Sequence, residues 1–377
     1  MLMTSIKKFW RFIGIYGIGR TLFKAIGRLR IAMPFYSLRR AHRDIGVIGC
    51  GQFAFATISY FLWRSYGNRI ASCFDTDRAA AVSLARAMRI PNVATTAVEL
   101  LRQPGIRLVY VASNHASHSG YAVQALERGL DVYIEKPIAV TYSQLVELLK
   151  ALRLSGARVF AGYNRPFSGA IRLLREEMNI DPSSGISMQC FVAGHALAAD
   201  HWYRRPDEGT RICGNMGHWL DLMVHIFCWR SLPDSMTISI LAADQNEPDE
   251  NVVVSLRSDR GDVVSIMLTA RSEPFEGILE TINIQHGETT CTIDDFRHVT
   301  IRKGSRLQRR RYRPKDVGHR AAVLQPFSPG PRRAWNEVVM STLLMLEITE
   351  MVRHGAQRRE FSFSVASARL EGDLNRI

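Results

Sequence analysis

A glycine-rich turn between two apolar segments constrains the fold of this chain more than any other feature. An apolar run ends at Ile48, and Gly49, Gly51 and Ala54 follow it with the spacing GxGxxA. The first glycine permits a tight turn, the second lets the backbone approach a pyrophosphate, and the alanine allows close helix packing. Glycine-rich turns are common, so the spacing alone is a weak signal. It predicts a dinucleotide site whose turn comprises Gly49, Gly51, Gln52 and Phe53.

Asp75 directly follows the next predicted strand, which covers residues 69–74. A carboxylate 24 residues after Gly51 can accept hydrogen bonds from the adenosine ribose and repel a 2′-phosphate, which favours NAD over NADP. Arg78 tempers this preference, because a guanidinium can accommodate the phosphate, and NADP stays an alternative. The competing interpretation of Asp75 is a helix-capping residue.

Two more apolar runs, residues 108–112 and 132–134, are also followed by polar side chains. The carboxyl ends of parallel strands meet at one edge of a sheet, where open α/β sheets bind their ligands. Pro137 keeps Lys136 out of the helical region and aims its ammonium from a stiff turn, whereas a solvated loop lysine is the competing interpretation. The pattern predicts a doubly wound parallel Rossmann domain with further cofactor contacts from Ser113, Asn114, His115, His118, Glu135 and Lys136.

After Arg165 the pattern changes to runs of alternating apolar and polar residues, which indicate strands of an antiparallel sheet. We therefore expect a second, α+β domain with a mostly antiparallel open sheet. The predicted ranges are 1–43 for a basic amphipathic arm, 44–164 for the Rossmann domain, 165–330 for substrate binding and oligomerisation, and 331–377 for a C-terminal helix and tail that pack back on the core.

The segment between the first two of these strands holds a candidate catalytic histidine. His218 and Asp221 are three residues apart on one predicted helix, so the carboxylate could orient the imidazole. His225 lies two turns from His218, which does not suit a metal pair on adjacent turns, so we predict no metal site. A structural role is the alternative for each histidine.

The ordered motifs GVIGCG, Asp75, VASNHASH, IEKP and AGYNRPF resemble the glucose-fructose oxidoreductase, inositol dehydrogenase and MocA (Gfo/Idh/MocA) family from residue 44 onward. The resemblance implies an NAD(P)-dependent oxidoreductase in which Lys136 lies between nicotinamide and substrate and His218 takes the substrate hydroxyl proton. It also implies homo-oligomers formed through the antiparallel sheet, and substrate contacts from Asn164, Arg165, His201, Trp202, Asn215 and His218.

One departure from that family pattern lies four residues before His218. Many members carry Asp there, whereas this chain has Gly214 followed by Asn215. The stretches ADHW and GTRICGNMGHWLDL are similar to a branch encoded with bacterial surface-polysaccharide genes, which implies a sugar or sugar-nucleotide substrate. The missing Asp also motivates an alternative, a non-catalytic cofactor-binding scaffold at a membrane surface.

The net charge of +14 comes from two clusters. Residues 1–43 carry ten Lys or Arg and no acid, and residues 302–315 carry eight and no acid. The first cluster predicts an arm that packs on its own domain or a sister subunit, with membrane-surface association as the main alternative. The second could bind a diphosphate or form a solvated loop. Since no nucleic-acid-binding module accompanies either cluster, we expect no nucleic-acid partner.

The six cysteines lie mostly in apolar runs and show no CxxC spacing. This usage favours buried thiols in a reducing compartment over zinc sites or disulfides. We therefore expect a cytoplasmic protein, with peripheral membrane contact through the arm as an alternative.

Overall fold

The computed structural model describes residues 2–31, 34–37, 39, 41–198, 200–271, 274–329 and 333–376, with side chains from residue 9 onward. The chain forms two compact units. Unit 1 comprises residues 1–139, 143–162 and 319–332, and unit 2 comprises residues 140–142, 163–318 and 333–377.

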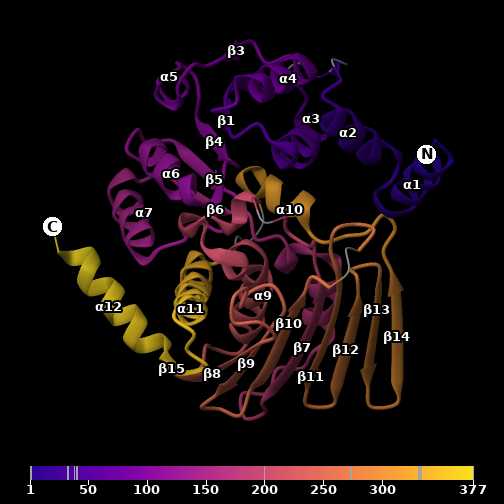
Figure 1. Cartoon of the computed structure of the whole chain (residues 1–377), viewed down its shortest axis with the longest axis vertical. Helices are drawn as coiled ribbons and strands as arrows, with labels where there is room; N and C mark the ends of the chain where they lie inside the picture. The colour runs from indigo at the N-terminus through magenta and orange to yellow at the C-terminus, as the bar shows by residue number, and fades with distance from the viewer. Residues whose placement is uncertain are drawn as a thin grey trace. The chain divides into compact units, whose positions relative to one another are not determined.

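Unit 1 contains a parallel sheet with the strand order β3-β2-β1-β4-β5-β6 (Figure 1). This is the order of the doubly wound dinucleotide-binding fold, and it confirms the predicted fold class. The strands are β1 (Ile45–Ile48), β2 (Ile70–Phe74), β3 (Asn92–Val93), β4 (Leu108–Val111), β5 (Asp131–Ile134) and β6 (Val159–Ala161). The helices are α3 (Tyr60–Tyr66), α4 (Arg78–Met88), α5 (Ala97–Leu101), α6 (His118–Leu126), α7 (Tyr142–Ser155) and α10 (His319–Leu324), with a π-helical segment at Ala54–Ser59 and a 3-10 turn at His115–Ser117.

The short apolar runs become central strands because both of their faces are covered. All four residues of β1 and of β4 are buried. A continuous apolar run of this length is typical of a parallel strand between two helical layers. The carboxyl ends of β1, β2, β4 and β5 therefore lead into the polar turns at residues 49, 75, 113 and 135.

The N-terminal arm consists of α1 (Leu2–Tyr16) and α2 (Ile18–Leu29), separated at Gly17, whose φ is +79°. Phe23 and Ile26 of α2 are buried in the core of unit 1. The Phe23 ring stacks on Phe35 at 3.8 Å and lies 5.5 Å from Trp63. The arm therefore packs on its own Rossmann domain, one of the two placements predicted for it, and the boundary predicted at residue 43 does not separate two compact units. No helix in the described part of the chain is long and apolar enough to cross a bilayer.

Unit 2 is built on a nine-stranded sheet with the order β14-β13-β12-β11-β7-β10-β9-β8-β15 (Figure 1). Every pair is antiparallel except β7 with β10, which confirms the predicted mostly antiparallel sheet. The strands are β7 (Ile186–Ala193), β8 (Ser235–Ala242), β9 (Val252–Ser258), β10 (Val263–Thr269), β11 (Leu279–His286), β12 (Thr289–Asp294), β13 (His298–Lys303), β14 (Arg306–Arg311) and β15 (Arg358–Ser362).

The helices of unit 2 are α8 (Gly169–Glu177), α9 (Gly217–Phe227), α11 (Trp335–Arg353) and α12 (Phe363–Asn375). Shorter turns lie at Arg165–Phe167, Trp202–Arg204, Pro206–Glu208 and Ile212–Met216. Helix α9 contacts β7, and α11 packs on α9. Alternate residues of β7 are buried beneath these helices, as the period of two predicts.

The predicted boundary at residue 330 also needs correction, because residues 319–332 return to unit 1. The Tyr110 hydroxyl donates a 2.7 Å hydrogen bond to the carbonyl of Val323, which is itself fully buried. Nearby, Gln325 Nε2 donates to the Ala161 carbonyl at 3.0 Å. This segment thus completes the core beside β4 and β6.

Candidate active site

The turn after β1 has the shape that a dinucleotide requires. Gly49 has φ +87°, and a Cβ there would lie 2.4 Å from the backbone of Ala112, so only glycine fits. A Cβ on Gly51 would meet nothing within 4 Å, which leaves open space where a pyrophosphate would approach. These residues therefore fit an NAD-type cofactor.

Asp75 lies beside this turn, half-buried at the end of β2. Its Oδ2 accepts a 2.6 Å hydrogen bond from the Cys50 backbone N–H, and its Oδ1 accepts one of 2.8 Å from Asp77. The N-cap of α4 is Asp77, whose side chain accepts from Ala79 N–H. The helix-capping interpretation therefore belongs to Asp77, and Asp75 stays a candidate for the ribose hydroxyls.

His118 connects the turns after β4 and β5. Its Nδ1 lies 2.9 Å from the Pro137 carbonyl oxygen, and its Nε2 lies 3.1 Å from the Ser113 carbonyl oxygen. Burial lowers the pKa of His118 to about 4, so the imidazole is neutral. The single N–H of the neutral ring can donate to only one of these two carbonyls. Because His118 is buried between the two turns, its side chain is not open to a cofactor, which corrects its prediction as a cofactor contact.

The other polar residues after β4 form a compact turn. The Ser117 hydroxyl donates to Asn114 Oδ1 at 2.6 Å and lies 2.7 Å from Ser113 Oγ. Asn114 is exposed and Ser113 half-buried, whereas His115 is buried. Ser113 and Asn114 thus stay predicted cofactor contacts, while the burial of His115 favours packing.

Glu135 is buried beneath the turn that carries Lys136. The Tyr133 hydroxyl donates to its Oε1 at 3.0 Å, and the Lys136 backbone N–H donates to its Oε2 at 3.1 Å. A Cβ on Gly162 would lie 2.4 Å from Oε1, so the glycine after β6 leaves room for the carboxyl. Burial raises the pKa of Glu135 to about 7 against the opposing charge of Lys136. Glu135 thus stabilises the turn through its hydrogen bond with the Lys136 backbone. The Lys136 side chain is half-buried and is the more accessible of the two.

Glu135→Gln should change how stability depends on pH. Because the folded pKa of about 7 exceeds the ordinary 4.5, the stabilisation from the protonated carboxyl is complete below pH 4.5 and is lost as pH rises through 7. Between about pH 5 and pH 7.5, the free energy of unfolding should fall by about 2 kcal/mol more in the wild type than in the variant. Urea unfolding at both pH values measures this difference. His118 has the opposite slope in both proteins, so it cancels, and equal slopes would contradict the prediction.

His218 lies in the first turn of α9 in unit 2, and its side chain is half-buried. Its ring is edge-on to Tyr163 at 6.3 Å and to Trp219 at 5.9 Å. Asp221 is buried and contacts Arg333 Nη1 at 2.7 Å and the Ser341 hydroxyl at 2.9 Å. The carboxylate is therefore engaged by the C-terminal segment, which corrects the expectation that it orients His218.

His225, the second histidine of this helix, has a structural role. Its Nδ1 lies 2.8 Å from Glu337 Oε2, and its Nε2 accepts from the Trp229 indole at 3.3 Å. Among the residues that the structure describes, no group of three potential metal ligands gathers.

Two of the predicted substrate contacts lie inside unit 2. Arg165 is buried, its Nε and Nη2 donate to the two oxygens of Glu280, and its guanidinium lies 4.2 Å from the Trp219 ring centroid. Arg165 is therefore a packing residue, which corrects its predicted substrate contact. Asn164 donates from Nδ2 to the Val317 carbonyl. Its Oδ1 is buried without a hydrogen-bond partner in the described part of the chain, so Asn164 stays a candidate.

The remaining predicted substrate residues lie on the segment before α9. His201 Nδ1 accepts from Tyr203 N–H at 3.2 Å, and the Trp202 ring lies 5.8 Å from His201. Burial and the charge of Arg204 lower the pKa of His201. Asn215 Oδ1 accepts from Arg211 Nε at 3.4 Å. These side chains are half-buried and stay predicted contacts.

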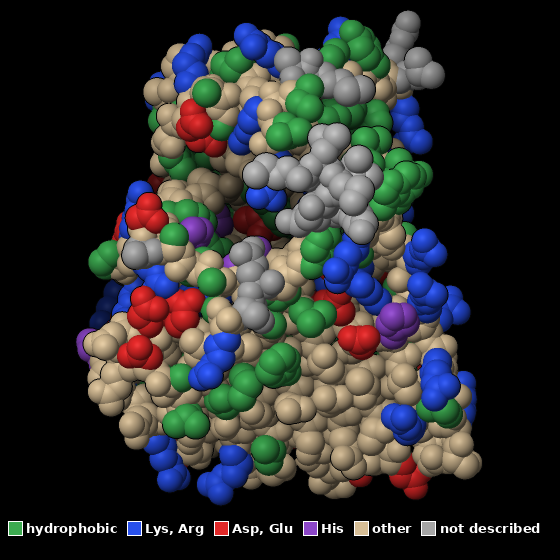
Figure 2. Space-filling view, turned by 45° about the vertical axis from the view of Figure 1, so that its right-hand side comes forward, with side chains coloured by type: hydrophobic (Ala, Val, Ile, Leu, Met, Phe, Trp, Pro, Cys, Tyr) green, Lys and Arg blue, Asp and Glu red, His purple; other side chains and the backbone are tan. Residues whose placement is uncertain are grey.

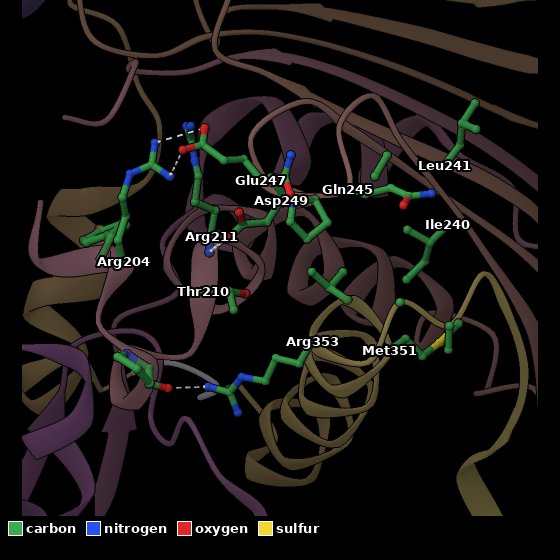
Figure 3. Close-up of a pocket in the computed structure, with 18 of the residues that line it drawn as sticks. Arg204, Thr210, Arg211, Ile240, Leu241, Gln245, Glu247, Asp249, Met351 and Arg353 are labelled. Atoms are coloured by element: carbon green, nitrogen blue, oxygen red, sulfur yellow. Dashed lines mark hydrogen bonds and ion pairs between the residues drawn. The ribbon is translucent and has the colours of Figure 1, made fainter. Parts of the chain in front are cut away.

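A cavity of about 760 Å³ opens within unit 2 next to this segment (Figure 3). It lies between the 203–211 segment, the loop after β8 and the end of α11. Arg204 pairs with Glu247 across its rim, and Arg353 donates to the Pro206 carbonyl (Figure 3). None of the predicted substrate residues lines it. No local pattern marks Arg204 and Arg353, because their partners, Glu247 and Pro206, lie far away in the chain.

Comparison with known proteins agrees with this geometry. A model of the oxidoreductase family with the NAD-binding Rossmann fold (GFO_IDH_MocA) matches residues 43–163. Inositol 2-dehydrogenase from Ralstonia nicotianae is 27% identical over 184 residues, which are 48% of this chain and 51% of the relative. The match thus spans about half the length of this curated relative.

Two solved structures share the fold. The structure of GenD2 from gentamicin A biosynthesis in complex with NAD has a TM-score of 0.69 at 17% identity, covering 88% of this chain and 99% of that one. Biliverdin reductase from Synechocystis sp. PCC 6803, in complex with biliverdin and NADP+, has a TM-score of 0.65 at 13% identity, covering 82% and 98%. Residues 43–163, which hold the glycine turn and Asp75, thus match the NAD-binding Rossmann domain of the Gfo/Idh/MocA oxidoreductase family, and both solved structures share the fold of the chain.

Proposed function

We propose that this protein is an NAD(P)-dependent dehydrogenase that transfers a hydride between nicotinamide and a hydroxyl or keto group of a sugar or sugar nucleotide. The observation that carries the proposal is the turn after β5, where Lys136 follows buried Glu135 at the same sheet edge as the open Gly51 turn. Open parallel sheets bind cofactor and substrate at this edge.

Each proposed catalytic residue has one role. The bound nicotinamide accepts or supplies the hydride. Lys136 donates a hydrogen bond to the reacting substrate oxygen and stabilises the negative charge that develops there. His218 takes the hydroxyl proton as general base. Because Gly214 stands where many family members have Asp, His218 does this without an Asp from that position.

The sugar class rests on similarity to relatives that are named inositol 2-dehydrogenases, which supports a polyhydroxylated substrate. We place the reaction in polysaccharide or sugar-nucleotide metabolism. The test is mass spectrometry of small molecules released from the freshly purified protein, followed by NAD(P)H formation with sugars and sugar nucleotides. Stoichiometric oxidation of one of them supports the proposal. Bound NAD(H) without oxidation of any would favour the scaffold alternative.

We also propose that the N-terminal arm contacts an anionic membrane surface. Ile18, Leu22 and Leu29 lie on one side of α2 by their spacing, next to buried Ile26, and are 63%, 43% and 68% exposed. The arm contains ten cations and no acid. An exposed apolar face among cations suits anionic lipid, whereas two such arms would repel each other.

Binding to phosphatidylglycerol vesicles should depend on this face of α2. We expect the Leu22→Glu/Leu29→Glu variant to bind these vesicles at least about tenfold more weakly than the wild type, because each exchange removes apolar area and adds repulsion. Vesicle co-sedimentation measures this, with Val98→Glu, a change of an exposed apolar residue of α5, as the control. Equal binding of phosphatidylcholine vesicles, or no binding by the wild type, would reject membrane contact.

We also propose that the sheet of unit 2 forms a homo-oligomer through its uncovered face. Phe191, Val263, Met267 and Leu279 are 39–53% exposed there, and Phe191 pairs directly with Met267. The neighbouring exposed side chains of β7 and β10 are uncharged, whereas exposed Arg257 of β9 pairs with Val263. Figure 2 shows a broad surface over this sheet with few charged groups beside a band of hydrophobic ones. A contiguous patch of this kind is typical of a protein interface.

Met267→Lys should reduce the solution mass toward that of the 42.6 kDa chain. A lysine at this position would bring its charge into the interface without a partner, at a cost of several kcal/mol. Light scattering after size-exclusion chromatography measures the mass. Val365→Lys, an exposed apolar exchange on α12, should leave the mass unchanged. A wild type that is already monomeric would refute the interface.

A further inference from the structure

We propose that Arg30 of the N-terminal arm is a phosphate-binding residue of the dinucleotide site. Arg30 is the C-cap of α2, with φ +51°, and its Nη1 donates a 3.2 Å hydrogen bond to the carbonyl of Cys50. Cys50 is the residue between Gly49 and Gly51, so an arm that precedes the Rossmann domain reaches its glycine turn.

Two further contacts hold the arm at this turn. A Cβ on Gly27 would lie 2.7 Å from the Phe55 ring, so α2 packs closely on the helix that follows the glycines. Gln52 Nε2 donates to the Lys24 carbonyl at 3.0 Å, so this predicted cofactor residue turns its side chain to the arm. The Phe53 ring is edge-on to His319 at 5.7 Å, which directs it toward α10. Gln52 and Phe53 stay predicted cofactor contacts, with the Gln52 amide bonded to the arm and the Phe53 ring against His319.

Arg30 and Asp75 both form hydrogen bonds with the backbone of Cys50. Asp75 accepts from the Cys50 N–H, and Arg30 donates to the Cys50 carbonyl. A hydrogen bond with Cys73 and burial raise the pKa of the Cys50 thiol well above its usual value, and the charges of Asp75 and Arg30 act on it with opposite signs. The guanidinium is therefore close enough to influence the turn electrostatically.

The guanidinium retains donors for a ligand. Arg30 is exposed, and no carboxylate among the described side chains forms an ion pair with it. A guanidinium has five N–H donors in a fork that matches phosphate oxygens. The shared ligand chemistry is a phosphate ester: the pyrophosphate common to both dinucleotides, or the 2′-phosphate of NADP.

The test is a fluorescence titration of NADH and NADPH with the full-length protein. Arg30→Gln should weaken binding about tenfold, the usual effect of losing one charge-assisted hydrogen bond. Loss for both nucleotides assigns Arg30 to the pyrophosphate, and loss for NADPH alone assigns it to the 2′-phosphate. Arg30→Lys, which keeps the charge, should bind better than Arg30→Gln.

Arg28→Gln is the matched control, because Arg28 is exposed on the same helix. It should bind both nucleotides like the wild type. Unchanged affinity of Arg30→Gln, or a loss that Arg28→Gln shares, would overturn the inference. If the nucleotide-free Arg30→Gln variant unfolded at a lower temperature than the wild type, its weaker nucleotide binding would be explained by lost stability, and this result would also overturn the inference. Wild-type protein that binds neither nucleotide would overturn it together with the cofactor assignment.

Discussion

Lys136→Met should lower kcat for sugar oxidation by about 100- to 1000-fold, because it removes a preorganised donor from the reacting oxygen. His218→Asn should lower it by about 100- to 10,000-fold through loss of the general base. NADH affinity should stay within about threefold of the wild type in His218→Asn, since that residue acts on the substrate. Steady-state kinetics on the identified substrate and NADH titration measure the two effects separately.

Lys150→Met provides the matched control for Lys136→Met. Lys150 lies on α7, in the same unit but outside the polar turns that end β4 and β5. It should keep wild-type kcat. If either Lys136→Met or His218→Asn turned over like the wild type, the proposed mechanism would be wrong even if the protein bound NAD.

Glu280→Met should lower the free energy of unfolding by about 3–5 kcal/mol, the usual cost of removing one partner of a buried ion pair. Glu280 is 2% exposed, accepts both hydrogen bonds of Arg165, and accepts a third from the Trp219 indole at 2.8 Å. Its loss leaves a guanidinium charge without its partner in the interior of unit 2. Urea unfolding of the cofactor-free protein measures the change.

The exposed Arg306–Glu177 pair is the control for this buried one. Arg306 is 65% exposed, so Glu177→Gln should cost less than about 1 kcal/mol. The double variant Arg165→Met/Glu280→Met should recover part of the lost stability, because it removes both charges. If the Glu280→Met variant were as stable as the wild type, the contacts of Glu280 with Arg165 and Trp219 would not stabilise unit 2.

The Rossmann half was predictable because its signals are local. Gly49 needs positive φ where no Cβ fits, and β1 and β4 are continuous apolar runs buried on both sides. The predictions failed where a partner lies far away in the chain. Arg165 meets Glu280 across 115 residues, and Asp221 meets Arg333 across 112. No pattern in one sequence distinguishes such a buried pair from a ligand contact.

The second basic cluster shows the same limit for secondary structure. Residues 306–311, RLQRRR, have no apolar alternation, yet they form the edge strand β14 against β13. The hairpin partner supplies the backbone hydrogen bonds, and Gly304 with φ +55° makes the turn. Both sequence interpretations, a solvated loop and a diphosphate site, missed the strand. Four exposed arginines on it protect an open sheet edge from pairing with other chains.

The return of residues 319–332 to unit 1 has a consequence for dissection of the protein. A fragment that ended at residue 164 would contain every strand of the dinucleotide sheet but would lack Val323 and the carbonyl that accepts from the Tyr110 hydroxyl. That hydroxyl is fully buried in the intact chain and would lose its partner. The nucleotide-binding half is therefore not a detachable module, and gene fusions or truncations that treat it as one should yield an unstable product.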